Sequence, residues 1–464
     1  MSKLEEAFDV KDFRNQGHQL IDQLADHLVA AQKGDHKVVR YNVSPEAELS
    51  RWRDYKFESL GQFFGDILSS NMQVHHRRYI GHQVSAPAPV SALAGLLSEF
   101  ANCGMGVYEM SAGGTAIEKI VVQEFCKAVG YDMDSSDGVL TSGGTLANLT
   151  GLLAARADYL TKHPHKRPYI LVSNQAHFCV DRGAMTMGLK SDQVVKINTT
   201  DDFKIDTSQL ENSINQIIKS GGHIMAIVAC ACTTSTGSYD DLKTIANICE
   251  RHNIWMHVDG AHGGAAVFSK KYKSICAHIE RADSIIIDAH KMMLTPALAT
   301  AVLFKKKKDS YRTFAIEADY LFEKNDEEWY NLAKRTYETT KYMMCIKIYA
   351  LFKYHGLELI DEYVTRQYDL TRKFAAHLKE QADFEIAHEP MSNILCFRYT
   401  PKESSHLNEL NTAIRKRLLE KGDFYIVQTT LNGDLYLRVT IMSPYTSMED
   451  LKELLSLIRD LQKK

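Results

Sequence analysis

The sequence predicts an α/β protein in three parts: a helical arm over residues 1–84, a large α/β domain over residues 85–345 and a smaller α+β domain over residues 346–464. The main observation is a series of short apolar runs that alternate with stretches whose apolar residues recur at helical spacing. This alternation is typical of a mostly parallel sheet covered by helices on both faces. The runs predict a sheet of seven strands: DGVLTSGG, RPYILVSNQ, DQVVKIN, HIMAIVACACTT, NIWMHVDGAH, ADSIIIDAHK and ATAVLFKK.

The flanking parts differ from this pattern. Residues 17–32 and 48–71 have apolar residues at helical spacing and little strand signal. The stretch APAPVSALAGLLSEFANCG begins with alternating prolines and then becomes helical, which predicts a boundary near residue 85. After residue 345, the helical stretches 358–381 and 447–462 enclose three expected strands, SNILCFRYT, FYIVQTT and DLYLRVTIM.

Composition limits the classes of function. The 464 residues are 45% hydrophobic and 24% charged, and 55 Lys and Arg against 58 Asp and Glu give a net charge of −3. Neither a basic stripe nor an acidic block is present, so nucleic acid and membrane surfaces are poor candidate partners. The nine cysteines contain no CxxC motif, and no stretch approaches the roughly 18 apolar residues of a membrane span. We expect a cytoplasmic protein with no metal site.

Polar groups follow the expected strands at the edge where ligands of parallel sheets bind. They are the TSGGT turn of residues 141–145, His177, Thr233 and Thr234, Asp259 with His262, and Lys291. The TSGGT turn opens a helix whose first N–H groups are free, which is either ordinary strand-to-helix loop chemistry or a phosphate site.

A single cofactor would use all of these groups. Asp259, at the end of a buried strand, needs a cationic partner, and a protonated pyridine nitrogen is one such partner. Lys291 is then expected to form a Schiff base with pyridoxal 5'-phosphate, its amine activated by apolar surroundings. His177 would lie on one face of the ring, and Ala261 would leave the other face open. Read separately, Asp259 is more often a helix cap or a salt-bridge partner and Lys291 a solvated cap, and His177 is at least as often a core residue.

In these segments the chain resembles the group II pyridoxal-phosphate-dependent amino-acid decarboxylases, which have fold type I. The resemblance runs from about His76 to the C-terminus. It rests on HRRYIGHQ, YEMSAGGTAIEKIV, LTSGGTLANLTGLLAAR, NQAHFCVDRGA, CTTSTGSYDDL, HVDGAHGG and DAHKMM. Among members of this family, the segments are most similar to those of the bacterial L-2,4-diaminobutyrate decarboxylases. The residues YE at the start of YEMSAGGTAIEKIV and YLF near residue 320 are also similar to glutamate decarboxylases.

The resemblance implies roles for individual residues. Lys291 would bond the cofactor, Asp259 would pair with the pyridine nitrogen and His177 would stack on the ring. The remaining contacts to the cofactor would come from Gly143, Gly144, Thr145, Thr234, Ala261 and His290. The substrate pocket would be lined by His82, Gln83 and Arg438. The family's homodimers imply that the helical arm, whose apolar face is too exposed to stand alone, wraps a second subunit. Residues 102–110 would then complete the neighbouring site.

Three positions depart from the family pattern. Asp288 stands where the family usually has asparagine beside the phosphate, and an acid there repels a dianion. His262 replaces a common aromatic residue of the pocket wall. In the segment after residue 318, Asp326 falls where many relatives have a catalytic tyrosine, and nearby Tyr330 is the candidate to replace it.

The implied reaction is decarboxylation of an L-amino acid to a primary amine and CO2. His82, Gln83 and His262 make a polar pocket, which favours small polar substrates, with L-2,4-diaminobutyrate first and aspartate, glutamate or cysteine sulfinate as alternatives. The presence of Asp326 at the position of the catalytic tyrosine motivates a second hypothesis, an oxygen-consuming, decarboxylating aldehyde synthase. A cofactor-binding regulator without activity is a third, disfavoured by the joint presence of Lys291, Asp259 and His177.

Overall fold

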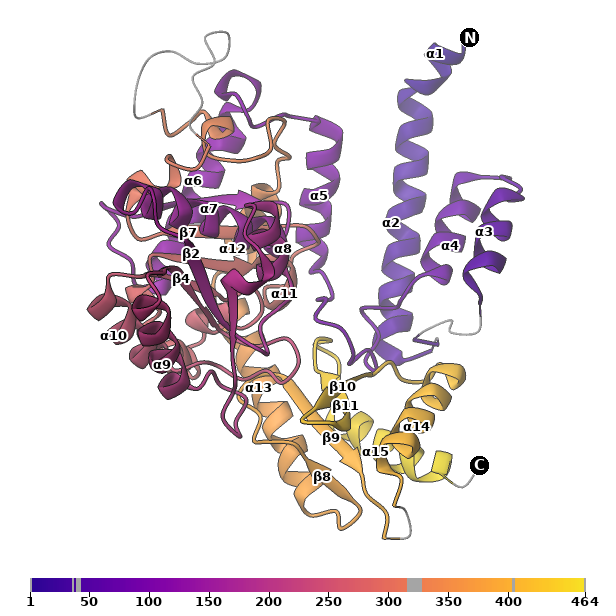
Figure 1. The fold of residues 1–464 in the computed structure, drawn as a ribbon. Coiled ribbons are helices and arrows are strands. Elements are labelled where there is room, and N and C mark those ends of the chain that lie inside the picture. The colour runs from indigo at the N-terminus through magenta and orange to yellow at the C-terminus, as the bar shows by residue number, and fades with distance from the viewer. Residues whose placement is uncertain (1, 36, 39–42, 315–327, 403–404, 463–464) are drawn as a thin grey trace. The chain divides into compact units, whose positions relative to one another are not determined.

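The computed structural model describes residues 2–35, 37–38, 43–314, 328–402 and 405–462 (Figure 1). The chain forms two compact units. One combines Met1–His82, Arg372–Ala387 and Leu395–Lys464, and the other combines Gln83–Thr371 with His388–Ile394. The division into an arm and two domains expected from the sequence stays a prediction.

The unit of Gln83–Thr371 and His388–Ile394 contains a sheet of seven strands in the order β1-β7-β6-β5-β4-β2-β3. The strands are β1 (Asp137–Thr141), β2 (Pro168–Ser173), β3 (Val194–Ile197), β4 (His223–Cys230), β5 (Trp255–Asp259), β6 (Ser284–Asp288) and β7 (Thr300–Phe304). β7 is antiparallel to both β1 and β6, and the other neighbours pair in parallel. The mostly parallel seven-stranded sheet predicted from the apolar runs is therefore confirmed.

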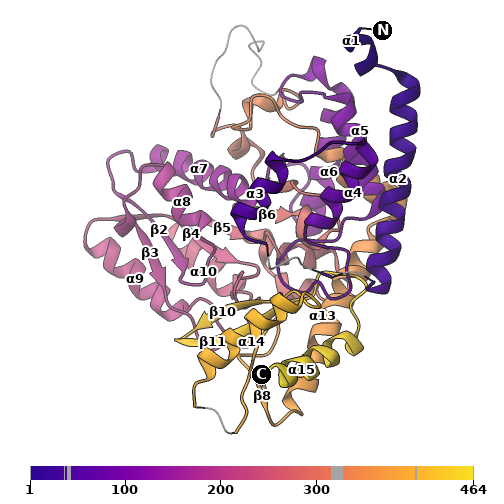
Figure 2. The same cartoon turned by 90° about the vertical axis from the view of Figure 1, so that its right-hand side faces the viewer.

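Helices cover both faces of this sheet. The helices of this unit are α5 (Pro89–Ala101), α6 (Ala112–Val129), α7 (Gly144–Lys162), α8 (Cys179–Thr186), α9 (Thr207–Lys219), α10 (Leu242–His252), α11 (Ala289–Met292) and α12 (Cys345–His355), of which α12 packs against α5 and α6. Figure 2 shows α7 and α8 on one side of the strands β2 to β5, and α9 and α10 on the other. α7 contacts β1, β4, β5, β6 and β7, so it crosses most of the sheet.

Strand alternation decides which side chains face α7. Successive residues of a strand point to opposite faces, so Trp255, His257 and Asp259 of β5 share one face. Trp255 packs in the apolar cluster that α7 and α8 make with the sheet, which identifies the face. His257 and Ser284 are partners in the register of β5 and β6. Polar groups of neighbouring strands therefore meet beneath α7.

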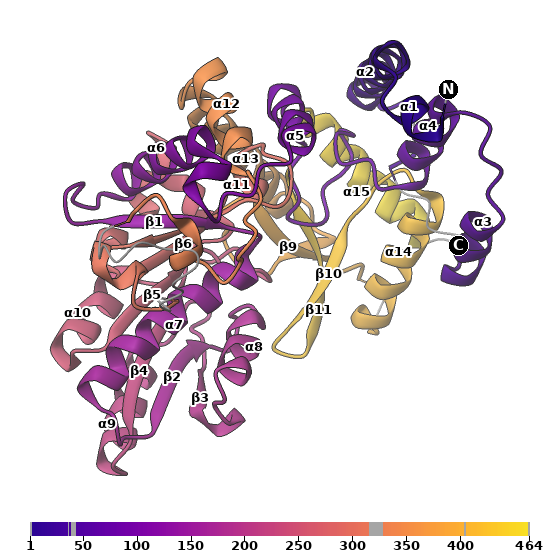
Figure 3. The same cartoon turned by 90° about the horizontal axis from the view of Figure 1, so that it is seen from above.

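The other unit contains a four-stranded sheet in the order β10-β11-β9-β8, in which β10 pairs with β11 and β8 with β9 in antiparallel fashion. Its strands are β8 (Phe384–Ile386), β9 (Ile394–Tyr399), β10 (Val427–Leu431) and β11 (Asp434–Thr440). Its helices are α1 (Lys3–Ala7), α2 (Val10–Lys33), α3 (Pro45–Arg53), α4 (Leu60–Ser70), α14 (Leu407–Lys421), α15 (Met448–Gln462) and the second part of α13 (Glu358–Lys379). α14 and α15 lie on one face of the sheet (Figure 3).

The N-terminal segment is joined to this small sheet by main-chain hydrogen bonds. Ile80 N–H donates to the carbonyl of Tyr425, and Thr440 N–H donates to the carbonyl of Ile80. Arg77 forms an ion pair of 2.7 Å with Asp450, at the start of α15. These bonds explain why residues before His82 and residues after Leu395 form one compact unit.

Several elements differ from the sequence expectation. The helical stretch of residues 48–71 is interrupted, because Asp54 ends α3 and Ser59 begins α4 by accepting a hydrogen bond from Gln62 N–H. The strand β8 and the helix α14 were not predicted, and β8 is only three residues long. Within the described part of the chain, no helix has both the length and the hydropathy that a bilayer span requires.

Candidate active site

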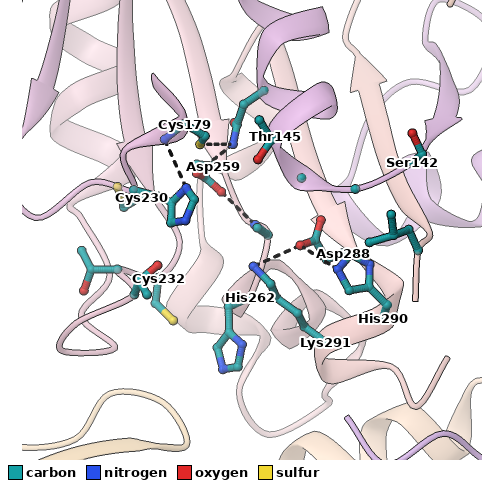
Figure 4. Close-up of a pocket in the computed structure, with 18 residues that line it drawn as sticks. Ser142, Thr145, Cys179, Cys230, Cys232, Asp259, His262, Asp288, His290 and Lys291 are labelled. Atoms are coloured by element: carbon teal, nitrogen blue, oxygen red, sulfur yellow. Dashed lines mark hydrogen bonds and ion pairs between the residues drawn. The ribbon is translucent and has the colours of Figure 1, made fainter. Parts of the chain in front are cut away.

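A cavity of about 370 Å³ opens at the carboxyl ends of β1, β4, β5 and β6 (Figure 4). All nine residues predicted to bind a cofactor line it: Gly143, Gly144, Thr145, His177, Thr234, Asp259, Ala261, His290 and Lys291. They converge because the ends of parallel strands meet at one edge of the sheet, although they are spread over about 150 residues of sequence. His262 and Asp288 also line it, whereas Gln83 and Tyr330 of the same unit do not.

The N-terminus of α7 supplies free hydrogen-bond donors to the cavity. Gly143 precedes the helix with a φ of 106°, and no side chain caps the first turn. A Cβ atom on Gly144 would lie 3.1 Å from both carboxylate oxygens of Asp288, so glycine keeps this approach open. The N–H groups of the first turn, with the positive end of the helix dipole, favour an anion such as a phosphate.

Lys291 lies on the short helix α11, directly after β6, with its Nζ atom 3.0 Å from Oδ2 of Asp288. Figure 4 shows the side chains of Lys291 and His290 pointing toward Asp288. Burial lowers the pKa of Lys291, but the carboxylates of Asp288 and Asp259 raise it by more, so the pKa lies above that of an ordinary lysine. The expectation of an amine activated by apolar surroundings is therefore wrong, because two carboxylates stabilise the ammonium form.

Asp259 ends β5 with both carboxylate oxygens engaged. Oδ2 accepts a hydrogen bond of 3.0 Å from Asn148 Nδ2, and Oδ1 accepts one of 3.1 Å from Ala261 N–H. The side chain is 8% exposed and lines the cavity. A carboxylate held in this way can accept a further hydrogen bond from a cationic ring nitrogen.

His177 lies in the turn between β2 and α8. The N–H of Cys179 donates to its Nδ1 atom over 3.2 Å, so Nδ1 is the acceptor and a neutral ring carries its proton on Nε2. Burial lowers the pKa of His177, and the attraction of Asp259 offsets this in part. The ring is thus neutral near pH 7, which suits a side chain that packs on an aromatic ring.

The thiols in the cavity wall are not candidate nucleophiles. Burial raises the pKa of Cys179 and of Cys232 to about 12, and it raises the pKa of Cys230 well above its ordinary value. Thiols with such pKa values remain protonated near neutrality and react slowly. Lys291 is therefore the nucleophile that the cavity offers.

The predicted substrate residues are divided between the two units. His82 and Arg438 belong to the unit with the small sheet, where the ring of His82 lies 5.5 Å from that of Tyr425. Gln83 belongs to the other unit, and its Nε2 atom is buried without a hydrogen bond to any described residue. The ring of Tyr330 lies 5.3 Å from that of Tyr108, and Asp326 lies outside the described residues.

Asn148 and His257 are functional candidates that the sequence reading missed. Asn148 contacts Asp259 from α7, one turn after Gly144, and the Nε2 atom of His257 lies 2.8 Å from Asn148 Oδ1. A signal existed for His257, because a residue two positions before Asp259 must share its face of the strand. No such periodicity links Asn148 to Asp259.

The described residues fit pyridoxal 5'-phosphate. The cavity combines an amine, a carboxylate with free acceptor capacity, an imidazole and a helix N-terminus that a Cβ atom at position 144 would crowd. These are the groups that the aldehyde, the pyridine nitrogen, the ring face and the phosphate of the cofactor require. Asp288, whose carboxylate approaches Gly144 at the start of α7, is a lining group whose charge disfavours a phosphate.

Curated relatives span three substrate classes. The chain is 26% identical over 466 residues to an aromatic-L-amino-acid decarboxylase of Bacillus atrophaeus, covering 97% of this chain and 95% of the relative. It is 28% identical to an L-2,4-diaminobutyrate decarboxylase of Acinetobacter baumannii, with 86% and 82% covered. It is 26% identical to an acidic amino acid decarboxylase of Bos taurus, with 89% and 84% covered.

Solved structures share the fold over nearly the whole chain. A structure of Oryza sativa TDC with PLP and tryptamine has a TM-score of 0.91 at 18% identity, and covers 98% of both chains. A decarboxylase domain from Vibrio parahaemolyticus, described as part of a diaminobutyrate-pyruvate transaminase and L-2,4-diaminobutyrate decarboxylase, has a TM-score of 0.83 at 26% identity, covering 96% of this chain and 95% of that one. The predicted fold type I is thereby confirmed.

A family comparison agrees with the geometry of the cavity. The profile of the pyridoxal-dependent decarboxylase conserved domain matches residues 53–400, well over half of the chain. With the cofactor-shaped cavity at the strand ends, this match shows that the chain belongs to the pyridoxal-dependent decarboxylase family and is an amino-acid decarboxylase that uses pyridoxal 5'-phosphate.

Proposed function

We propose that the enzyme decarboxylates a small polar L-amino acid, with L-2,4-diaminobutyrate as the first candidate. The observation that carries this proposal is His262, which lines the cavity, is 2% exposed and has its Nε2 atom 2.7 Å from Oδ1 of Asn393. A hydrogen-bonded imidazole there makes the wall polar, and a polar wall favours substrates that hydrogen-bond to it. The relative from Acinetobacter baumannii is named an L-2,4-diaminobutyrate decarboxylase, which is consistent with this substrate.

The chemistry divides between the cofactor and the chain. Pyridoxal 5'-phosphate, when bound, supplies an aldehyde for the substrate amine and a ring that accepts the electron pair released as CO2 leaves. Lys291 would hold the cofactor covalently, and its Nζ atom would take up or give a proton near Asp288. Asp259 would keep a proton on the pyridine nitrogen, and neutral His177 would cover one ring face. The first turn of α7 and His290 would bind the phosphate.

The proton donor to the substrate carbon is a further part of the proposal. Tyr330 is the candidate, because it lies close in sequence to Asp326, the position at which the resemblance places a catalytic tyrosine. Its ring packs with the rings of Tyr108 and Trp329. Replacement of Tyr330 by phenylalanine should lower amine formation and leave cofactor binding unchanged, if this hydroxyl delivers the proton.

An acidic amino acid is the second candidate substrate. Arg438 and Arg415, in the unit with the small sheet, both act on His82, whose pKa is lowered first by burial and then by these two charges. The same two guanidinium groups lower the pKa of Tyr425, against the larger effect of burial. Two cations beside His82 favour a ligand with more than one carboxylate. This cluster supports aspartate, glutamate or cysteine sulfinate.

We also propose that the enzyme is a homodimer of the cytoplasm. α2 exposes Val10, Phe13, Ile21, Leu24 and Val29, and α5 exposes Leu93, Leu96, Leu97 and Phe100. Apolar stripes of this kind are uncommon on monomer surfaces and are typical of interfaces between subunits. All nine cysteines, each a described residue, are free, as expected in a reducing compartment.

A product assay tests the proposed function. The purified enzyme with its cofactor is given diaminobutyrate, ornithine, lysine, aspartate, glutamate, cysteine sulfinate and tyrosine, and CO2, amine and O2 are followed together. We expect equal amounts of CO2 and amine without O2 uptake, and the highest kcat/KM for diaminobutyrate. O2 uptake with aldehyde release would instead support the aldehyde synthase hypothesis. A preference for aspartate or glutamate would instead support an acidic amino acid as the substrate.

Two substitutions sharpen this test. Replacing His262 by phenylalanine should lower kcat/KM for diaminobutyrate by about tenfold or more relative to tyrosine, because the wall loses its polar group. The matched control is His388→Phe, since His388 is also a buried, hydrogen-bonded histidine but does not line the cavity. An unchanged substrate ranking in His262→Phe would show that another residue sets specificity.

A further inference from the structure

Asp259 is the last member of a continuous chain of buried hydrogen bonds. Trp255 Nε1 donates to Ser284 Oγ over 2.9 Å, and Ser284 Oγ lies 2.7 Å from His257 Nδ1. His257 Nε2 lies 2.8 Å from Asn148 Oδ1, and Asn148 Nδ2 donates to Asp259 Oδ2 over 3.0 Å. The chain links β5, β6 and α7 within one compact unit.

The direction of every bond follows from its two ends. The carboxylate of Asp259 accepts, so Asn148 must present its amide nitrogen to Asp259 and its oxygen to His257. A neutral His257 therefore carries its proton on Nε2, and Nδ1 accepts from the hydroxyl of Ser284. Ser284 Oγ in turn accepts from the indole N–H of Trp255, which can only donate. All four donors thus point toward the carboxylate.

The surroundings of His257 keep this arrangement in one state. His257 and Ser284 are 0% exposed, and Asn148 is 1% exposed. Burial lowers the pKa of His257 to about 3, so the ring stays neutral over the whole physiological range. Asn148 also lies 3.2 Å from the sulfur of Cys179, which leaves its amide little freedom to turn.

Gly151 provides independent evidence that α7 is shaped around this ring. A Cβ atom at position 151 would lie 2.5 Å from Cε1 and 2.7 Å from Nδ1 of His257, well inside contact distance. Glycine in the interior of a helix costs about 0.5–1 kcal/mol relative to alanine. The helix therefore accepts a less stable residue at the position where it crosses the imidazole.

We propose that Asn148 and His257 are positioning residues that aim the carboxylate of Asp259 at the pyridine nitrogen of the cofactor. This inference rests on the proposed role of Asp259. A carboxylate on a strand end can rotate about its Cβ–Cγ bond, and the donated bond from Asn148 holds Oδ2 toward α7. His257 fixes the Asn148 amide in the required orientation, and Ser284 fixes the tautomer of His257. Replacement of His257, which does not line the cavity, should therefore weaken cofactor binding through Asn148 and Asp259.

The test measures cofactor affinity and spectrum in variants along the chain. Pyridoxal 5'-phosphate is titrated into the cofactor-free full-length protein, and the dissociation constant and the visible absorption of the bound cofactor are recorded. We expect Asn148→Leu and His257→Phe to raise the dissociation constant by about tenfold or more and to shift the absorption. Ser284→Ala should have a smaller effect, since it acts through two further bonds. kcat should fall more than KM rises.

Two variants separate positioning from a structural role. His257→Gln retains an amide donor near the place of Nε2, and we expect it to recover most of the affinity and the spectrum lost in His257→Phe. Thr150→Val is the matched control on the same helix, because it removes a buried hydroxyl that bonds the carbonyl of Leu146 and takes no part in the chain. This control should keep the affinity and spectrum of the wild-type protein.

The outcomes distinguish this proposal from the proposed role of Asp259. If Asp259→Asn leaves cofactor affinity and spectrum unchanged, then the role of Asp259 itself is wrong. If Asp259→Asn impairs both but Asn148→Leu and His257→Phe lower thermal stability alone, the positioning proposal is overturned. The same holds if His257→Gln is as impaired as His257→Phe. Should His257→Phe fail to fold, the comparison of Asn148→Ser with Thr150→Val decides in the same way.

Discussion

The Nζ atom of Lys291 lies 3.0 Å from Oδ2 of Asp288, a carboxylate that is 2% exposed. Oδ1 of the same carboxylate accepts a hydrogen bond of 2.6 Å from Thr300 Oγ1, so its position is determined by β7 as well as β6. Lys291 is therefore paired with a carboxylate that favours its ammonium form. Formation of a Schiff base must break this pair, because the lysine reacts as a free amine.

Replacement of Asp288 by asparagine should ease that step. Loss of the carboxylate removes an attraction that raises the pKa of Lys291, and removes a negative charge from the phosphate site. Stopped-flow absorbance should show the cofactor-free variant capturing pyridoxal 5'-phosphate several-fold faster than wild type at pH 8. The control is Thr300→Val, which removes the hydrogen bond to Asp288 but keeps the charge. Slower capture by Asp288→Asn would mean that the acid assists binding.

The ion pair of Lys291 with Asp288 should stabilise the folded protein at neutral pH and lose this effect at alkaline pH. Since the pKa of Lys291 is raised in the folded state, its contribution is complete below the unfolded value of about 10.4 and is lost as the pH rises through the folded value. Asp288→Asn should lower the free energy of unfolding by about 1–3 kcal/mol at pH 8. The difference from wild type should shrink as the pH rises through the folded-state pKa of Lys291. A difference that is constant with pH would contradict the ion pair as its cause.

His257 should make the fold sensitive to acid. Its pKa is about 3 in the folded state and about 6.5 when unfolded, so below pH 6.5 the unfolded chain binds one proton more. Stability from this group is complete above pH 6.5 and falls by about 2 kcal/mol between pH 6.5 and pH 5. Urea unfolding across this range should show a shallower pH dependence in His257→Gln. Equal slopes in the two proteins would show that His257 is accessible to protons in the folded state.

Gly151→Ala should destabilise the protein although alanine favours helices. Its Cβ atom would lie 2.5 Å from His257 Cε1, and overpacking of this kind costs about 1–3 kcal/mol. Gly65→Ala is the control, since a Cβ atom there has no neighbour within 4 Å and helix propensity alone predicts a gain of about 0.5–1 kcal/mol. Thermal unfolding of both variants checks the sign. A stabilising Gly151→Ala would mean that the ring of His257 moves freely.

Leu97→Glu should weaken the proposed dimer. Leu97 is 60% exposed on α5 beside other exposed apolar residues, and a charge inside an apolar interface is costly. Sedimentation should show the dimer dissociating at a concentration about tenfold higher or more than for wild type. Leu160→Glu places the same charge on an exposed leucine of α7 and should leave the assembly unchanged. A wild-type protein that sediments as an active monomer would contradict the proposal.

The sequence by itself determined the large sheet and the main groups of the site. Seven apolar runs predicted the seven strands, because burial on both faces requires continuous apolar segments. The groups at the strand ends, such as Asp259 and Lys291, could then be placed together, since parallel strands end at one edge. Short or irregular features, such as the strand β8 and the break before Ser59, carry too few residues for a periodic signal.

The tertiary structure alone decided the partners of those groups. The alignment of His257 with Ser284 depends on the register of β5 against β6, and the contact of Asn148 with Asp259 depends on how α7 crosses the sheet. The pairing of Lys291 with Asp288 likewise depends on the turn at α11. Local sequence patterns report burial and backbone period, whereas hydrogen bonds between distant segments depend on packing distances of a few tenths of an ångström. The environment that sets the pKa of Lys291 and the orientation of Asp259 therefore became visible only in the folded chain.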